Sequence, residues 1–444
     1  MLAFTKRLES KINIAEKTQT LIGFFVTITL ILTIAYFTFG TYRDWSYKVE
    51  ADGKYYYHYL VSLVYDHDID FTNNYAAPKP EWMRLLLDPY GQHRYTNPVN
   101  GAPSNLWTVG PAILWFPFHV VAWASGSLIN LLFHAGVDLD PWGLYMQYGT
   151  MIAAVVYCLL ALWLVYLLLK NYFGFKAILG GLALLLFATN LVYYSTMEVS
   201  MSHVYDFFSM VLFIFCLKRV SDNLGNTFQF GILGAAAGLH TLVRTQNVVT
   251  IGIFGLFLGY LLLRERQIAW KLRLLNYLLF GAVYFFSCIP LFLINNYLFN
   301  NPITIPQGDG FLKAPHIFEL FFSDHNGMFY YNPVLLVGLL SALWLLWRSW
   351  RTRNPQGWWL VAFLAAFMAQ VVINAAAFDW WGADATGQRR LIGSYFIFAV
   401  GLTNVFEKMG EWKSTPRLLG KIVLWALVPL NLFFIYQYVF VWNY

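Results

Sequence analysis

Acidic residues, histidines and aromatics gather in one stretch of this 444-residue chain, from Tyr42 to Thr108, although only 12% of the whole sequence is charged. Asp52 is the first residue there that could do chemistry. A carboxylate within hydrogen-bond reach of a hydroxyl can act as a general base and take its proton. Asp52 also precedes a helical pattern, where an aspartate often caps the first backbone N–H groups. The sequence leaves the catalytic role and the capping role equally open.

Three residues near the middle of the chain form a second candidate site, namely Glu198, His203 and Asp206. Ionisable side chains at membrane depth are costly and are usually retained for function. His203 and Asp206 are three positions apart, so a helix would place them on one face. We expect at least one of the three residues to be catalytic. The alternative is a structural ion pair or hydrogen bond.

Arginines offer a different chemistry, because a guanidinium can bind two phosphate oxygens at once. Arg244 lies between two short apolar runs, and Arg389 and Arg390 follow a loop with two glycines that would let the backbone approach a ligand. We predict that Arg389 or Arg390 binds an anion, with Arg244 less favoured and Asp384 part of the same substrate site. The alternative is that these arginines pair with Asp379 or Asp384.

Asp66, Asp68 and Asp70 alternate along one segment, so an extended chain would point their carboxylates the same way. Such oxygens could bind a divalent cation. The segment lacks the glycine and the distant glutamate of a calcium-binding helix–loop–helix. A solvated loop is the favoured interpretation. Asp68 and Asp70 remain the candidate metal ligands, and the sequence indicates no other cofactor.

The elements that must position these residues are membrane helices. The chain is 59% hydrophobic and 19% aromatic, and its mean hydropathy is +0.52, which exceeds what a soluble protein shows. Repeated apolar runs near spanning length predict an all-α, polytopic transmembrane bundle that forms one domain over 1–444. The runs lie at about 21–39, 111–133, 145–169, 177–195, 201–218, 229–243, 246–263, 274–296, 329–347, 357–376, 391–406 and 421–441.

The charges of the loops set the predicted topology, since cytoplasmic loops are enriched in Lys and Arg. The N-terminus should be cytoplasmic, with the first loop, 41–110, and a second large loop, 297–328, outside. The net charge of +6 comes from such loop clusters, so we expect no nucleic-acid partner. We expect about 11 crossings and termini on opposite sides. Through 111–195 the loop charges do not place successive loops on alternating sides of the membrane. This indicates that one element there does not cross.

Tyrosines recur at helical spacing between Lys54 and Tyr65. We expect a short amphipathic helix that lies along the membrane interface, with its tyrosine rings at headgroup level. Tyr56 and His58 in this stretch are predicted substrate-binding residues.

The chain resembles the C-type (GT-C) membrane glycosyltransferases, the superfamily of protein mannosyltransferases and lipid A aminoarabinose transferases. Short motifs carry the resemblance over most of the chain. They are the Tyr-rich segment after Asp52 with Asp66-His-Asp-Ile-Asp70, the proline-bearing segment 100–111, the polar turn 196–206 and the segment 238–246. The segment 379–391 is similar to a late motif of bacterial members described only as mannosyltransferase-like.

This resemblance implies an inverting glycosyltransferase of a bacterial inner membrane with its active site outside. The donor would be a polyprenyl-phosphate-linked sugar, and the acceptor a hydroxyl of a glycan, lipid or protein. Asp52 matches by position the acid that activates the acceptor, Arg389 or Arg390 would hold the lipid phosphate, and the second acidic site of some members falls near 198–206. Many members carry an acidic pair at the first site, whereas here Gly53 follows Asp52.

Two other functions remain open for a chain of this kind. A transporter or flippase of lipid-linked glycans would place ionisable residues near the membrane midplane in two related halves. No such internal repeat is visible in the sequence. A polymerase or ligase of surface polysaccharide would use a large late outer loop, which 297–328 could supply.

Overall fold

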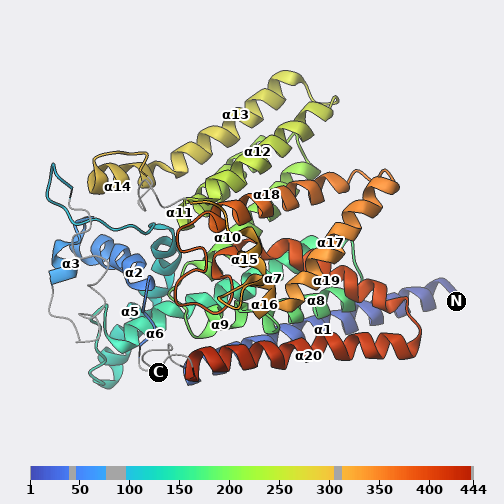
Figure 1. Ribbon diagram of the computed structural model, residues 1–444, viewed down its shortest axis with the longest axis horizontal. Coiled ribbons are helices and arrows are strands. Elements are labelled where there is room, and N and C mark those ends of the chain that lie inside the picture. Colours follow the sequence, from blue (N-terminus) through green and yellow to red (C-terminus); the bar gives the residue numbers. More distant parts are fainter. Residues whose placement is uncertain (1, 40–46, 77–96, 305–312, 442–444) are drawn as a thin grey trace.

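The structure is a computed structural model, and it describes residues 2–39, 47–76, 97–304 and 313–441 (Figure 1). Parts of both predicted outer loops, 40–46, 77–96 and 305–312, lie outside the described residues. Within the described ranges every regular element is helical. The elements are α1 (Leu2–Thr38), α2 (Gly53–Val61), the π-helix η1 (Ser62–Asp66), α3 (Thr72–Ala76), α5 (Gly110–Phe133), α6 (Leu144–Met151), α7 (Ala153–Leu169), α8 (Phe175–Phe187), α9 (Leu191–Thr196), α10 (His203–Asp222), α11 (Thr227–Val243), α12 (Asn247–Arg264), α13 (Trp270–Ser287), α14 (Ile289–Phe299), α15 (Ile317–Phe322), α16 (Met328–Tyr331), α17 (Pro333–Arg351), α18 (Gly357–Ala375), the 3₁₀ helix η2 (Arg389–Ser394), α19 (Tyr395–Gly410) and α20 (Ser414–Phe440).

The predicted all-α membrane architecture is confirmed. Of the helices described, eight stretches are long and apolar enough to cross a membrane, which makes the chain an integral membrane protein. Helices α8 and α11 are apolar but shorter. The expected number of about 11 crossings therefore stays a prediction. The eight stretches are Ala15–Thr38, Gly110–Phe133, Leu144–Leu169, Asn247–Arg264, Trp270–Phe299, Pro333–Arg351, Gly357–Ala375 and Ser414–Phe440.

The first and last helices run in the same direction. In Figure 1, α1 begins at the right, and α20 ends at the left. The last turns of α20 contact α9, where the rings of Tyr438 and Tyr193 are 5.7 Å apart, and α1 reaches the same end of the bundle. Parallel first and last helices require an odd number of crossings, as the loop charges predict.

Helix α5 fits the expectation that one element in 111–195 does not cross. Its start packs on the end of α11, where a Cβ added to Gly110 would lie 2.3 Å from the carbonyl oxygen of Leu242. Helix α6 begins at the same end of the bundle, because the O–H of Tyr36 in α1 donates to the carbonyl of Tyr148 at 2.6 Å. We infer that α5 starts and ends on one side of the bundle and lies across that end.

Small residues allow the bundle helices to approach closely, as is common between membrane helices. A Cβ on Gly401 of α19 would lie 1.9 Å from the carbonyl oxygen of Gly338 in α17. A Cβ on Gly238 of α11 would lie 2.2 Å from the Cβ of Ser287 in α13. The backbones themselves are therefore in contact where α19 crosses α17, and the backbone of α11 contacts a small side chain of α13.

The helical pattern between Lys54 and Tyr65 is present as α2 and η1, but its predicted environment was wrong. Tyr56, Tyr57 and Tyr59 are buried within the protein instead of lying at headgroup level. The O–H of Tyr57 donates to the carbonyl of Pro141 at 2.6 Å, and that of Tyr59 to the carbonyl of Trp107 at 3.0 Å. A row of tyrosines suits a protein interior with hydrogen-bond acceptors as well as it suits a membrane interface.

Lys48 ties the loop before α2 to the end of α1. Its Nζ donates to the carbonyls of Tyr36, at 2.5 Å, and Phe39, at 2.6 Å. A cation at the C-terminal end of a helix is favourable because the last carbonyls lack helical partners. Burial lowers the pKa of Lys48 to about 8. This contact fixes the backbone only four residues before Asp52.

We predict that Gly401→Ala lowers the melting temperature of the purified protein. The added methyl group would force α17 and α19 apart, and overpacking of this kind costs about 1–3 kcal/mol. Gly281→Ala in α13 is the matched control, since no heavy atom lies within 4 Å of its added Cβ. Equal melting temperatures for Gly401→Ala and the unaltered protein would contradict the close crossing.

Candidate active site

The side chain of Asp52 points to an arginine instead of capping a helix. It makes no capping hydrogen bond to α2. Its Oδ2 accepts a hydrogen bond from Nη2 of Arg389 at 3.3 Å, across 337 positions of the sequence. The structure therefore decides against the capping role and brings the candidate base together with one of the predicted anion-binding residues.

The two members of this pair differ in exposure. The side chain of Asp52 is 38% exposed, whereas that of Arg389 is 7% exposed. Among the described residues, Nε of Arg389 has no hydrogen-bond partner, and its Nη1 reaches the sulfur of Met201 at 3.9 Å. A guanidinium carries five N–H donors. Arg389 therefore keeps donors available for a further acceptor beside an accessible carboxylate.

The surroundings of Arg389 keep it charged. Burial lowers the pKa of its guanidinium, but the negative charges of Asp52 and Glu198 outweigh that effect and raise the pKa above the usual value. Burial also raises the pKa of Tyr56 to about 12, with a smaller rise from the Asp52 carboxylate. At neutral pH the site thus combines a permanent cation with a protonated tyrosine.

Arg389 is held in place by the loop that precedes η2. Gly387 has φ +64°, and a Cβ there would lie 2.6 Å from Nδ2 of Asn332 at the start of α17. Asn190 donates from Nδ2 to the carbonyl of Thr386 at 2.7 Å and from its backbone N–H to Oδ1 of Asn332 at 2.8 Å. Glycine permits this backbone conformation without steric cost. The loop is therefore fixed from two helices before it reaches Arg389.

The turn between α9 and α10 holds the start of α2. The backbone N–H of Glu50 donates to Oγ of Ser200 at 3.2 Å, and a Cβ on Gly53 would lie 2.0 Å from the same oxygen. The O–H of Tyr56 donates to Oγ of Ser202 at 3.1 Å. Gly53 is thus the residue that lets this turn approach the backbone directly after Asp52.

Glu198 and His203 flank this turn and are both buried, with exposures of 1% and 5%. Glu198 lies near enough to Arg389 to raise its pKa. The ring of His203 lies 5.0 Å from that of Tyr194, and neither of its nitrogens has a hydrogen-bond partner among the described residues. Both residues are therefore shielded from solvent, and their predicted catalytic roles stay predictions.

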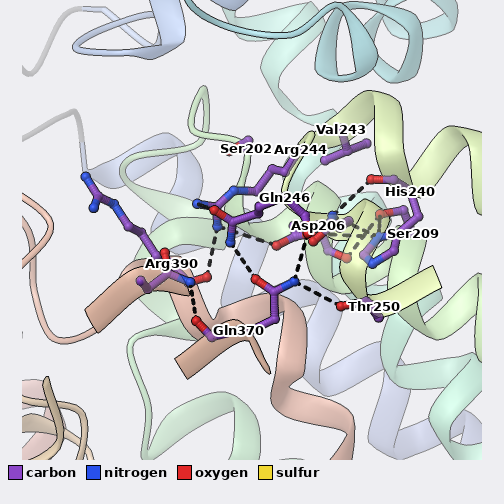
Figure 2. A network of polar contacts seen from close by, with 12 residues as sticks. Ser202, Asp206, Ser209, His240, Val243, Arg244, Gln246, Thr250, Gln370 and Arg390 are labelled. Carbon is purple, nitrogen blue, oxygen red and sulfur yellow. Dashed lines mark hydrogen bonds and ion pairs between the residues drawn. The ribbon is translucent and has the colours of Figure 1, made fainter. Parts of the chain in front are cut away.

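Asp206 belongs to a second polar network, which is drawn in Figure 2. Its carboxylate accepts a hydrogen bond from Nδ2 of Asn247 at 2.7 Å. It also lies 3.5 Å from Nη1 of Arg244 and 3.6 Å from Nδ1 of His240. The side chain is only 3% exposed, so the structure favours the ion-pair alternative over a catalytic role for Asp206.

A small cavity of about 20 Å³ adjoins this second network. Its polar lining includes Asp206, His240, Asn247, Gln370 and Arg390. The side-chain amide of Gln370 donates to the hydroxyl of Thr250 at 2.9 Å. The pocket therefore belongs to the network around Asp206 and not to the exposed side of Asp52.

Arg390 turns away from Arg389 and pairs with Asp379. Its Nη1 lies 2.9 Å from Oδ1 and its Nη2 lies 2.5 Å from Oδ2 of that carboxylate, which is a bidentate pair. The alternative prediction, that these arginines pair with Asp379 or Asp384, is thus confirmed for Arg390. Asp384 is exposed in the same loop.

Apart from Tyr56, the candidates of the first loop interact with other neighbours. His58 is buried, with its Nδ1 3.4 Å from Oδ1 of Asn74. Asp68 accepts a hydrogen bond from Oγ of Ser62 at 2.7 Å, and Asp70 accepts one from Oγ1 of Thr72 at 2.6 Å. These carboxylates therefore stabilise local turns, as the solvated-loop interpretation predicts.

Several residues of the second network were not among the predicted site residues, among them His240, Asn247 and Gln370. His240 and Arg244 are four positions apart, so their spacing could have indicated a shared helix face. Asn247 and Gln370 are neutral residues inside apolar runs and give no comparable signal.

No protein-family model and no curated protein sequence matches the chain. Its structure is similar to the crystal structure of the Archaeoglobus fulgidus oligosaccharyltransferase in complex with Zn and sulfate. The TM-score is 0.56 and the identity is 15%, over 94% of this chain and 53% of that chain. The chain has the GT-C fold.

The structure of ArnT from Cupriavidus metallidurans bound to undecaprenyl phosphate also matches, with less similarity. Its TM-score is 0.49 and its identity 12%, over 95% of this chain and 71% of that chain. The present chain spans about half the length of the archaeal protein. The likeness to the archaeal protein confirms the predicted GT-C-like fold, and it concerns architecture alone.

We predict an energetic coupling between Arg390 and Asp379. Each single alanine variant leaves a largely buried charge without its partner, whereas the double variant removes both charges. A double-mutant cycle on unfolding free energy should give about 1–2 kcal/mol of coupling. The exposed pair Lys408 and Glu411 is the control and should give much less. Additive losses at Arg390 and Asp379 would contradict the buried bidentate pair.

Proposed function

We propose that the chain is an inverting glycosyltransferase that moves a sugar from a polyprenyl-phosphate donor to an acceptor hydroxyl. Asp52 takes the proton of that hydroxyl, and the oxygen attacks the anomeric carbon of the sugar. The bond from this carbon to the phosphate oxygen breaks, and the polyprenyl phosphate leaves with the electron pair. A single displacement of this kind inverts the anomeric carbon.

The contact between Asp52 and Arg389 carries this proposal. It joins an accessible carboxylate to a buried, permanently charged guanidinium that has donors to spare. A base must reach the acceptor, and a leaving phosphate needs its developing charge stabilised in a largely desolvated place. Arg389 meets the second requirement better than Arg390, whose guanidinium already binds Asp379.

The fold supports the same reaction class. The archaeal protein with a similar fold is an oligosaccharyltransferase, and its structure contains sulfate, a tetrahedral anion like phosphate. A membrane bundle is also suited to a donor with a long lipid. Its apolar helices can border the lipid tail, while the polar end of the bundle holds the phosphate. The charged loops favour an outer location for this end, with the N-terminus in the cytoplasm. The resemblance to GT-C enzymes implies a bacterial inner membrane.

A divalent cation has no step in this proposal. The archaeal structure contains Zn, but Asp68 and Asp70 use their oxygens on neighbouring hydroxyls. Over the described ranges, no three His, Cys, Asp or Glu side chains lie together as metal ligands. The proposal therefore assigns these two carboxylates to the local turns.

We predict that Asp52→Asn abolishes sugar transfer, because the amide cannot accept the hydroxyl proton. The measurement is transfer of radiolabelled sugar by the purified protein from a panel of polyprenyl-phosphate sugars. Asp222→Asn is the matched control. It removes an exposed carboxylate at the far end of α10, about 28 Å along the helix from His203.

Each result of this assay has a different meaning. Loss of transfer in Asp52→Asn alone supports both the reaction class and the base. Near-normal transfer would keep the reaction class and move the base to Glu198 or His203. No transfer by the folded wild-type protein from any donor would favour the transporter function.

We predict that Arg389→Ala weakens binding of polyprenyl phosphate by about tenfold or more, since a charge-assisted hydrogen bond contributes about 1.5–3 kcal/mol. Binding is measured as the Kd for a fluorescent polyprenyl phosphate in detergent. Arg264→Ala, at an exposed position that ends α12, is the control. An unchanged Kd for Arg389→Ala would remove the phosphate-binding role.

A further inference from the structure

The network around Asp206 lies directly against η2, the short helix that begins at Arg389. A Cβ added to Gly393 of η2 would lie 2.3 Å from Oδ2 of Asp206. Any residue with a Cβ at this position would collide with the carboxylate, so only glycine lets it come so close to the backbone. The buried carboxylate is therefore part of the surface on which η2 rests.

Arg244 makes a second contact with η2. Its Nη1 donates to the backbone carbonyl of Arg390 at 2.9 Å, and the same nitrogen lies 3.5 Å from Oδ2 of Asp206. Figure 2 shows the guanidinium between the carboxylate and the backbone of Arg390. One side chain thus links α10 to the peptide unit that follows Arg390.

This link is anchored by three helices. Asn247, at the start of α12, donates to Asp206 at 2.7 Å and to the carbonyl of His240 in α11 at 2.9 Å. Oγ of Ser209 in α10 lies 2.9 Å from Nδ1 of His240. A buried polar network with its hydrogen bonds formed is rigid and holds a unique geometry. The guanidinium of Arg244 is therefore held by a rigid set of neighbours when it contacts η2.

We propose that Asp206 and Arg244 are positioning residues that fix η2 so that Arg389 stays beside Asp52. The inference rests on the proposed function, in which Arg389 binds the donor phosphate. Arg244 acts through the backbone of Arg390 and contacts no substrate. This assignment replaces the expectations that Asp206 is catalytic and that Arg244 itself binds the anion. A displacement of about 1 Å in such a site can reduce activity by two orders of magnitude.

The test is a double-mutant cycle on the Kd for fluorescent polyprenyl phosphate. Arg389→Ala and Arg244→Ala are each expected to raise the Kd about tenfold. If Arg244 acts only through Arg389, the double variant should lie within about twofold of the weaker-binding single variant. Arg264→Ala should bind like the wild type.

Two further variants separate positioning from packing and from catalysis. Arg244→Lys keeps a donor for the carbonyl of Arg390 and should recover part of the affinity, whereas a pure packing role would not favour lysine. Asp206→Asn keeps the shape of the side chain, so it should weaken donor binding and leave the pH profile of kcat unchanged. If Arg244→Ala does not fold, Gly393→Ala supplies the same displacement of η2 from the opposite side of the contact.

The outcomes distinguish this inference from the proposed function. A roughly hundredfold loss in the double variant, the product of the two single losses, would show an independent contact by Arg244 and overturn the positioning role alone. A lowered melting temperature of Arg244→Ala with an unchanged Kd would also overturn the positioning role alone. A shifted pH profile in Asp206→Asn would make that residue catalytic. Wild-type Kd in Arg389→Ala would overturn the phosphate contact and the positioning role with it.

Discussion

The contact between Asp52 and Arg389 joins the first loop of the chain to its last third, and other segments hold both members in place. The turn with Ser200 and Ser202 fixes the start of α2, and Asn190 with Asn332 fixes the loop before η2. Neither Asp52 nor Arg389 is held by its own helix. The geometry of the site is therefore a property of the whole bundle, and helix packing far from the pair contributes to it.

Three carboxylates at this end of the bundle each pair with an arginine. Asp52 pairs with Arg389, Asp206 with Arg244 and Asp379 with Arg390. Burying a charge is costly unless a partner and hydrogen bonds compensate for it. Among these carboxylates only that of Asp52 is substantially exposed. The pairing thus stabilises two arginine–aspartate pairs inside the protein and leaves one carboxylate accessible to a reactant.

The sequence was sufficient to predict the membrane helices and to predict that carboxylates and arginines would form the candidate site. Apolar runs of spanning length identify a membrane bundle because few other structures satisfy the backbone in lipid. The sequence could not say which arginine pairs with which aspartate. Arg389 and Arg390 are adjacent and chemically identical, and only the direction of η2 sends one to Asp52 and the other to Asp379. The role of a neutral residue such as Asn247 could not be predicted either, because it depends on a carboxylate 41 positions away.

The long separation between Asp52 and Arg389 also determines when the site can exist during synthesis. The two residues are 337 positions apart, and at ribosomal rates of about 5–20 residues per second that distance takes roughly 20–70 s to make. For this interval α1 and the first loop exist without η2. A nascent chain therefore carries the carboxylate long before its guanidinium, and assembly of the last helices is the step that completes the pair.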